Sequence, residues 1–206
     1  METQARRVTL VDALPLDGTA ALLRDVVLVV AFGTLMALFA RISIPLPFTP
    51  VPITGQTFGV LLTGAVLGSR RGAAAMLVYL AEGIAGLPVF AFGLSGWAII
   101  TGPTGGYLLS YPLAAFAVGF LAERGWDGTF IRTAIAMLVG NVIIYLVGVP
   151  WLAHFIGMSN AITAGFTPFI GGDLFKLILA ALMVPSAWAL VNRSSPSDLM
   201  GTGLRH

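Results

Sequence analysis

Six apolar runs divide this chain, and they constrain its fold more than any other feature. They extend over residues 24–40, 56–68, 73–86, 105–121, 133–151 and 174–191. When helical, an apolar run of about 20 residues matches the hydrocarbon thickness of a bilayer. Of the 206 residues, 57% are hydrophobic and 10% are charged, against roughly 45–50% and 25% in soluble domains. We therefore expect an all-α integral membrane protein with six transmembrane helices.

The distribution of basic residues predicts how these spans are oriented. With six spans, nine of the eleven Lys and Arg residues lie on the side of the termini: Arg6, Arg7, Arg24, Arg70, Arg71, Arg124, Arg132, Arg193 and Arg205. Arg41 lies on the opposite side, and Lys176 falls inside the last run. Because basic residues concentrate on the cytoplasmic side, we expect both termini in the cytoplasm. The chain then has cytoplasmic tails over 1–23 and 193–206 and a membrane domain over 24–192 in the cytoplasmic membrane.

Several function classes find no support in the sequence. It contains no cysteine, and its two histidines, His154 and His206, are far apart, so we expect no metal site. The only lysine, Lys176, lies in Asp-Leu-Phe-Lys-Leu, which does not match a nucleotide-binding P-loop. HExxH and GxSxG motifs are absent as well. We expect a protein that is not an enzyme, has no cofactor and binds no nucleic acid.

Two long uncharged segments lie between runs on the predicted outer side, over 87–104 and 154–171. A third connection, 44–53, contains four prolines, which forbid a helix and favour extended backbone. Extended backbone does not satisfy its own hydrogen bonds in lipid, so this segment must pack on protein or line a cavity. We expect 44–53 to be a lid and the two uncharged segments to be long loops over a pocket.

An acid and a base, Asp173 and Lys176, open the last apolar run. Charged residues in lipid are costly and usually serve a pathway or a ligand. At a spacing of three residues, both side chains lie on one face of a helix. One interpretation is structural, with Asp173 capping the helix and Lys176 neutralised or reaching the interface. The other is that the pair binds a urea or amide, or that Lys176 binds a carboxylate near the positive helix end at Gly171 and Gly172.

Aromatic residues near the outer side are candidates for the walls of such a pocket, since ligand pockets are mostly apolar with few polar anchors. The candidates are Trp97, Tyr107 and Tyr145, together with Tyr111 and Phe90. The alternative is that some of these rings belong to the aromatic belt at the membrane interface.

Three further polar residues lie inside predicted spans. Glu82 either contacts the ligand, pairs with Arg41 or is protonated against a neighbouring helix. Gln56 and Asn141 are candidate ligand-binding residues too, although such amides also form hydrogen bonds between helices. On the first span, Gly33 and Ala37 are four residues apart and allow close approach of another helix, unless they face lipid.

Four stretches in order resemble one family of membrane proteins. They are Ile44-Pro45-Leu46-Pro47 with Val51-Pro52-Ile53-Thr54 and Gln56-Thr57, then Gly86-Leu87-Pro88-Val89-Phe90-Ala91, then Gly102-Pro103-Thr104-Gly105-Gly106-Tyr107-Leu108, and finally Gly172-Asp173 with Lys176. In these residues the chain resembles the BioY family, the biotin-binding S-components of energy-coupling factor (ECF) transporters. The resemblance runs from about Leu28 to Asn192.

The resemblance implies the S-component fold and high-affinity binding of biotin from outside. It implies partners as well, namely a transmembrane coupling subunit and two ATPase subunits that hydrolyse ATP. Asp173 and Lys176 would hold the ureido ring, with the valerate tail toward 44–53. Gly33 and Ala37 would contact the coupling subunit, although alanines are more usual there. The alternatives are an S-component for another small vitamin, an intramembrane enzyme using Glu82, Asp173 and Lys176, or a purely structural bundle.

Overall fold

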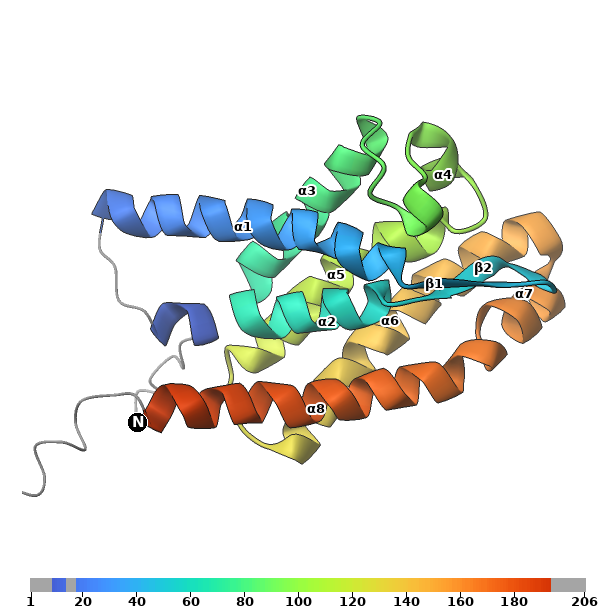
Figure 1. Ribbon diagram of the computed structural model, residues 1–206. Helices are drawn as coiled ribbons and strands as arrows, with labels where there is room; N and C mark the ends of the chain where they lie inside the picture. The colour runs from blue at the N-terminus through green and yellow to red at the C-terminus, as the bar shows by residue number, and fades with distance from the viewer. Residues whose placement is uncertain (1–8, 14–17, 194–206) are drawn as a thin grey trace, which may run out of the picture.

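The computed structural model describes residues 9–13 and 18–193. Six long helices pack side by side in one bundle (Figure 1), and each contains most of one predicted apolar run. These helices are α1 (Gly18–Arg41), α2 (Gln56–Leu67), α3 (Ser69–Ile84), α5 (Gly105–Ala122), α6 (Phe130–Ile156) and α8 (Ile170–Arg193). The start of α1 and the end of α8 lie at the same end of the bundle. The prediction of a helical membrane protein is confirmed.

Four segments are long and apolar enough to cross a membrane: α1, α5, α6 and the stretch Met158–Leu190, which includes most of α8. The other two long helices are shorter, because α2 has 12 residues and α3 has 16. A helix of 12 residues is about 18 Å long, which is less than the hydrocarbon thickness of roughly 30 Å. The number of crossings and the sides of the termini therefore stay predictions.

Small residues bring α2, α3 and α5 into close contact. A Cβ atom on Gly64 would lie 2.5 Å from the Ala115 carbonyl oxygen, and one on Gly119 would lie 2.3 Å from the backbone of Gly68. The link between α2 and α3 is Gly68 alone, whose positive φ of 84° reverses the chain. Residues 69–72, between the second and third apolar runs, form the first turn of α3.

Charged side chains gather at the end where α1 begins. Asp25 accepts from Arg71 at 2.7 Å. Glu123, at the end of α5, accepts from both the backbone N–H and the hydroxyl of Ser69 at 2.8 Å. The short helix η1 (Leu10–Ala13) packs there against α2 and α8, with Val11 buried. Residues 9–13, predicted to belong to a tail, are thus part of the bundle.

The opposite end carries the segments that cover the bundle. Residues 44–53 are extended, as predicted, within a hairpin of β1 (Ser43–Leu46) and β2 (Thr49–Thr54), paired antiparallel. Between α3 and α5 lie η2 (Ala91–Gly93) and α4 (Trp97–Thr101), and between α6 and α8 lie α7 (Met158–Gly165) and η3 (Thr167–Phe169). Figure 1 shows the hairpin, α4 and α7 at this end.

The prediction of a long loop over 154–171 is wrong. The helix α6 continues to Ile156, α7 follows directly after Gly157, and α8 begins at Ile170. Gly157 has a φ of 80°, so it turns the chain between α6 and α7 and no loop is needed there. The helix α7 buries Ala161, Ala164 and Gly165. The absence of charge in this segment is equally compatible with helix and with loop, so it could not distinguish them.

Candidate functional site

A cavity of about 230 Å³ lies beneath the hairpin, among the ends of α2, α5, α6 and α8. This volume is somewhat below the roughly 300 Å³ at which the usual sizes of ligand pockets begin. The wall is mostly apolar and comes from every covering segment except α7: Pro50, Val51, Pro52, Thr54, Gln56, Thr57, Phe90, Ala91, Phe92, Leu94, Ile99, Pro103, Thr104, Tyr107, Leu108, Tyr111, Ile144, Tyr145, Phe169, Asp173 and Lys176. The cavity therefore suits a small molecule with a large apolar part.

Asp173 and Lys176 form an ion pair on one face of the first turns of α8, as their spacing predicts. The Lys176 ammonium lies 3.1 Å from Asp173 Oδ1 and donates to the Thr57 hydroxyl at 2.9 Å. The other carboxylate oxygen, Oδ2, accepts from the Tyr145 hydroxyl. Asp173 is 6% exposed. Three helices, α2, α6 and α8, thus meet at this pair.

The pair keeps hydrogen-bonding capacity for a ligand. An ammonium has three N–H donors, and within the described chain two of them are used, on Asp173 and on Thr57. A carboxylate has about four lone-pair positions, and Tyr145, Lys176 and, at 3.5 Å, the Thr57 hydroxyl use three of them, which leaves Asp173 capacity for a further N–H donor. One acid and one base are the charged groups in the wall, which makes the wall neutral overall. The arrangement fits a neutral group that has both N–H donors and a carbonyl acceptor.

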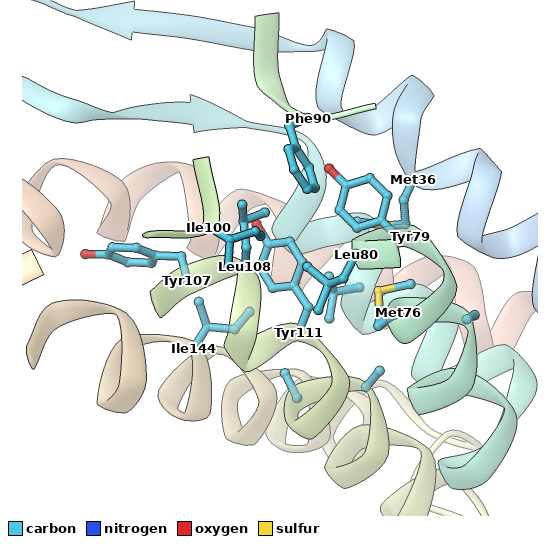
Figure 2. Packing of buried hydrophobic residues seen from close by; sticks show 14 of the residues in the cluster. Met36, Met76, Tyr79, Leu80, Phe90, Ile100, Tyr107, Leu108, Tyr111 and Ile144 are labelled. Carbon is cyan, nitrogen blue, oxygen red and sulfur yellow. The ribbon is translucent and has the colours of Figure 1, made fainter. Parts of the chain in front are cut away.

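Two tyrosines of α5 are fixed in the apolar wall. Tyr107 donates its hydroxyl proton to the Gly165 carbonyl at 2.9 Å, and its ring lies where a Cβ atom on Gly148 would be. Its ring also meets the Tyr145 ring edge to face, with centroids 6.4 Å apart. Tyr111 is 3% exposed and lies one turn further along α5. Figure 2 shows Tyr107, Tyr111 and Ile144 within the same packed cluster.

Five of the eight predicted ligand-binding residues come together in this wall: Gln56, Tyr107, Tyr145, Asp173 and Lys176. The candidate wall residues Tyr111 and Phe90 line it too. They meet because α2, α5 and α8 begin at the hairpin end of the bundle and α6 ends there, so these residues lie near one level.

The other three predicted residues do not line the cavity. Glu82 faces α1, where it accepts from the Thr34 hydroxyl at 2.8 Å. It does not pair with Arg41, which donates to the Pro88 carbonyl at 3.0 Å. Trp97 begins α4 and is 61% exposed. Asn141 is buried one turn of α6 from Tyr145, on the side away from the hairpin. Ligand contact by these three residues is not supported by this geometry.

The small pair on α1 is used within the molecule. A Cβ atom on Gly33 would lie 2.9 Å from both the Ala75 carbonyl oxygen and a methyl group of Val78, so Gly33 is buried against α3. Ala37 is partly buried against the same core. Gly33 and Ala37 therefore allow close approach of α1 to α3, and their contact with a partner subunit stays a prediction.

The role of Thr57 was hard to predict from the sequence. Its hydroxyl accepts from Lys176, and it lies 3.5 Å from Asp173 Oδ1. A threonine in an apolar helix more often bonds its own backbone, as Thr63 does to the Gly59 carbonyl. The sequence feature that could have indicated this role is the position of Thr57, beside Gln56 in the first helical turn after the proline-rich lid. That position places it at the level of the charged pair.

The fold and the site together define a helical membrane protein with a covered, small-molecule-sized cavity near one end of its bundle. The family model that matches the sequence, over residues 6–193, is that of the BioY family. The chain belongs to the BioY family.

Similar proteins agree with this assignment. The chain is 38% identical to the biotin transporter BioY of Rhizobium etli, with 78% of this chain and 90% of that protein covered. It is 42% identical to the biotin transporter BioY of Thermotoga maritima, with 74% and 88% covered. Among solved structures, the S-component for biotin from an ECF-type ABC transporter matches with a TM-score of 0.75 and 26% identity, covering 84% of this chain and 95% of that one.

Proposed function

We propose that this protein is the biotin-binding S-component of an ECF transporter and takes up biotin across the cytoplasmic membrane. The observation that carries the proposal is the Asp173–Lys176 pair, which has unused donors and acceptors in an otherwise apolar, covered cavity. Relatives over most of the chain are named as biotin transporters. Biotin fuses a cyclic urea to an apolar thioether ring, and these two rings match the two kinds of wall.

The proposed orientation places the ureido ring at the charged pair. Its carbonyl oxygen accepts the remaining Lys176 N–H, and a ring N–H donates to Asp173. The bicyclic ring then lies against Tyr107, Tyr111 and Ile144, and the valerate tail points toward β2. The opposite orientation, with the carboxylate on Lys176, makes a different prediction. In that case, biotin without its carboxylate would bind Lys176→Ala as well as it binds the wild type.

The proposed partners are a transmembrane coupling subunit and two ATPase subunits. This chain has no P-loop motif, so energy from ATP has to come from another protein. The protein itself then binds and carries the vitamin and is not an enzyme. In this arrangement residues 24–192 form the membrane domain, both tails are cytoplasmic and the cavity opens to the outside. The position of the charged end supports this orientation.

Calorimetry on the purified protein in detergent tests the ligand. We expect tight binding of biotin, weaker binding of dethiobiotin, and no competition by thiamine or riboflavin. Tight binding of another vitamin, without binding of biotin, would replace biotin as the proposed substrate. Purification from native membranes tests the partners, and ATPase subunits should copurify with this chain.

A further inference from the structure

Tyr79 joins the ligand cavity to the segment that covers it. This residue lies on α3 and is fully buried, and its hydroxyl has two partners from distant parts of the chain. One is the side-chain amide Nε2 of Gln56, which donates to it. The other is the backbone carbonyl of Val89, which accepts the tyrosine proton at 3.1 Å. Gln56 lines the cavity, and Val89 precedes η2 in the covering segment between α3 and α5.

These two bonds fix the direction of the Gln56 amide. A backbone carbonyl only accepts, so the Tyr79 proton must point to Val89. The Tyr79 oxygen must then accept from the Gln56 NH₂ group, and the Gln56 carbonyl oxygen points elsewhere. In the described chain, the buried side-chain oxygens without a partner belong to Glu82 and Asn141. The Gln56 carbonyl oxygen is not one of them, so it is not fully buried without a partner. The accessible space beside Gln56 is the cavity.

The covering segment is seated on the same tyrosine. The Phe90 ring meets the Tyr79 ring edge to face, with centroids 5.5 Å apart, and it lies 2.0 Å from where a Cβ atom on Gly83 would be. Figure 2 shows Phe90 beside Tyr79, on the side of the hydroxyl. Phe90 is 1% exposed and lines the cavity. Lifting this segment would remove both the ring contact and the acceptor of the Tyr79 proton.

We propose that Tyr79 is a positioning residue that turns Gln56 into an acceptor for a ligand N–H only while the covering segment is closed. When the segment lifts, the Tyr79 proton loses Val89, and Tyr79 then donates to the Gln56 carbonyl once the Gln56 amide has turned over, which leaves its NH₂ group facing the cavity. The acceptor facing the cavity is then lost. Closure and recognition of an N–H group are thereby coupled. The identity of the ligand as biotin, with its ureido N–H groups, rests on the proposed function above.

Tyr79→Phe tests the coupling, because it keeps the ring and removes the hydroxyl. We expect biotin affinity to fall about tenfold, which corresponds to about 1.4 kcal/mol. In a Gln56→Ala background the same change should have less than about a twofold effect, since residues that act through one another are not additive. The matched control is Thr63→Val, which removes a buried hydroxyl from α2 away from the cavity and should leave affinity unchanged.

A measurement without ligand separates this inference from the choice of substrate. The Gly96 N–H donates to the Gly83 carbonyl at 2.7 Å and reports whether the covering segment is seated on α3. In ligand-free Tyr79→Phe, hydrogen exchange at residues 86–96 should be faster than in the wild type. Unchanged exchange overturns the inference whether or not biotin binds. Full additivity with Gln56→Ala, or wild-type affinity in Tyr79→Phe, overturns it too. Faster exchange in a protein that does not bind biotin would overturn only the proposed substrate.

Discussion

At the level of single residues, the charged pair of α8 is tolerated in an apolar setting because each charge has several partners. A buried ion pair repays its desolvation only when further hydrogen bonds satisfy the remaining donors and acceptors. Here Thr57 and Tyr145 supply them. Each of these partners is neutral, so the pair stays balanced in charge. Removing one member leaves the other buried without its counter-charge.

Asp173→Asn is the first prediction at this scale. Asparagine keeps the size of the side chain, but it removes the negative charge and replaces one acceptor oxygen with a donor. We expect biotin binding to weaken at least about tenfold, or 1.4 kcal/mol, measured by calorimetry in detergent. Asp25→Asn, at the opposite end of the bundle, is the matched control and should bind normally. Near-wild-type affinity of a folded Asp173→Asn protein would remove Asp173 from the site.

Thr57→Val is the second prediction. Valine has the shape of threonine but does not accept the Lys176 N–H, which the structure places 2.9 Å from the hydroxyl. Lys176 then has one fixed partner fewer, and its ammonium is held less firmly toward the cavity. A hydrogen bond to a charged group contributes about 1.5–3 kcal/mol, of which only part affects binding, so we expect roughly fivefold weaker binding. Thr57→Ser should restore the affinity. Equal losses in both variants would contradict a role of the hydroxyl.

At the level of elements, the covering segment between α3 and α5 depends on a glycine of α3. The Phe90 ring occupies the space that any side chain at Gly83 would need, at 2.0–2.5 Å from an added Cβ atom. The contact joins the two elements without a charge or a hydrogen bond of its own. Its strength comes from apolar burial, which rises with the area that the ring covers.

Gly83→Ala is the prediction for this contact. The added methyl group must displace Phe90 from its slot, so the covering segment loses its anchor and biotin should dissociate about tenfold faster in a filter-binding chase. The control is Gly171→Ala, since nothing lies within 4 Å of the added atom. In a Phe90→Ala background, Gly83→Ala should have little further effect. Slower dissociation in that background than in Gly83→Ala alone would contradict this account.

The long helices were predictable because hydrophobic length and polar breaks determine them. The fourth run, 105–121, differs from α5 by one residue, since Thr104 precedes it and Glu123 follows it. The last residues of α6 were missed because no charged residue follows its predicted end at 151, and α8 begins at Ile170, four residues before the predicted start and ahead of the charged Asp173. The pairing of 44–53 into a hairpin was not predicted either. Prolines forbid helix there, but they carry no information about which strand a segment meets.

The site residues that could be predicted are those that are polar within an otherwise apolar run. Asp173, Lys176 and Gln56 attract attention because apolar runs rarely contain such residues. The same criterion selected Glu82 and Asn141, which lie in the same kind of run but face α1 and the inner core. Which way a helix is rotated depends on its neighbours, and a single sequence does not contain that information. Tyr79 was not selected, since its role depends on contacts with α2 and with the covering segment.

At the level of the whole molecule, the two ends of the bundle differ in kind. One end carries the ion pairs of Asp25 and the hydrogen bonds of Glu123, and the other carries the hairpin, the short helices and the cavity. Basic residues on the cytoplasmic side would place the cavity at the outer face. The short helix α2 enters directly from the hairpin, so its first residues, Gln56 and Thr57, lie below the level of the lid. With the proposed orientation, this arrangement predicts a shallow binding site that opens outward.

The orientation gives the last prediction, which uses the absence of cysteine from the natural chain. Phe48 is 63% exposed at the turn of the hairpin, and Thr129 is exposed in the connection between α5 and α6 at the charged end. In intact cells, a membrane-impermeant maleimide should label Phe48→Cys but not Thr129→Cys, and the unmodified chain is the unreactive control. After permeabilisation both variants should react. Labelling of Thr129→Cys alone in intact cells would show that the orientation is the opposite one. The cavity would then lie on the cytoplasmic side, which is incompatible with capture of an external vitamin.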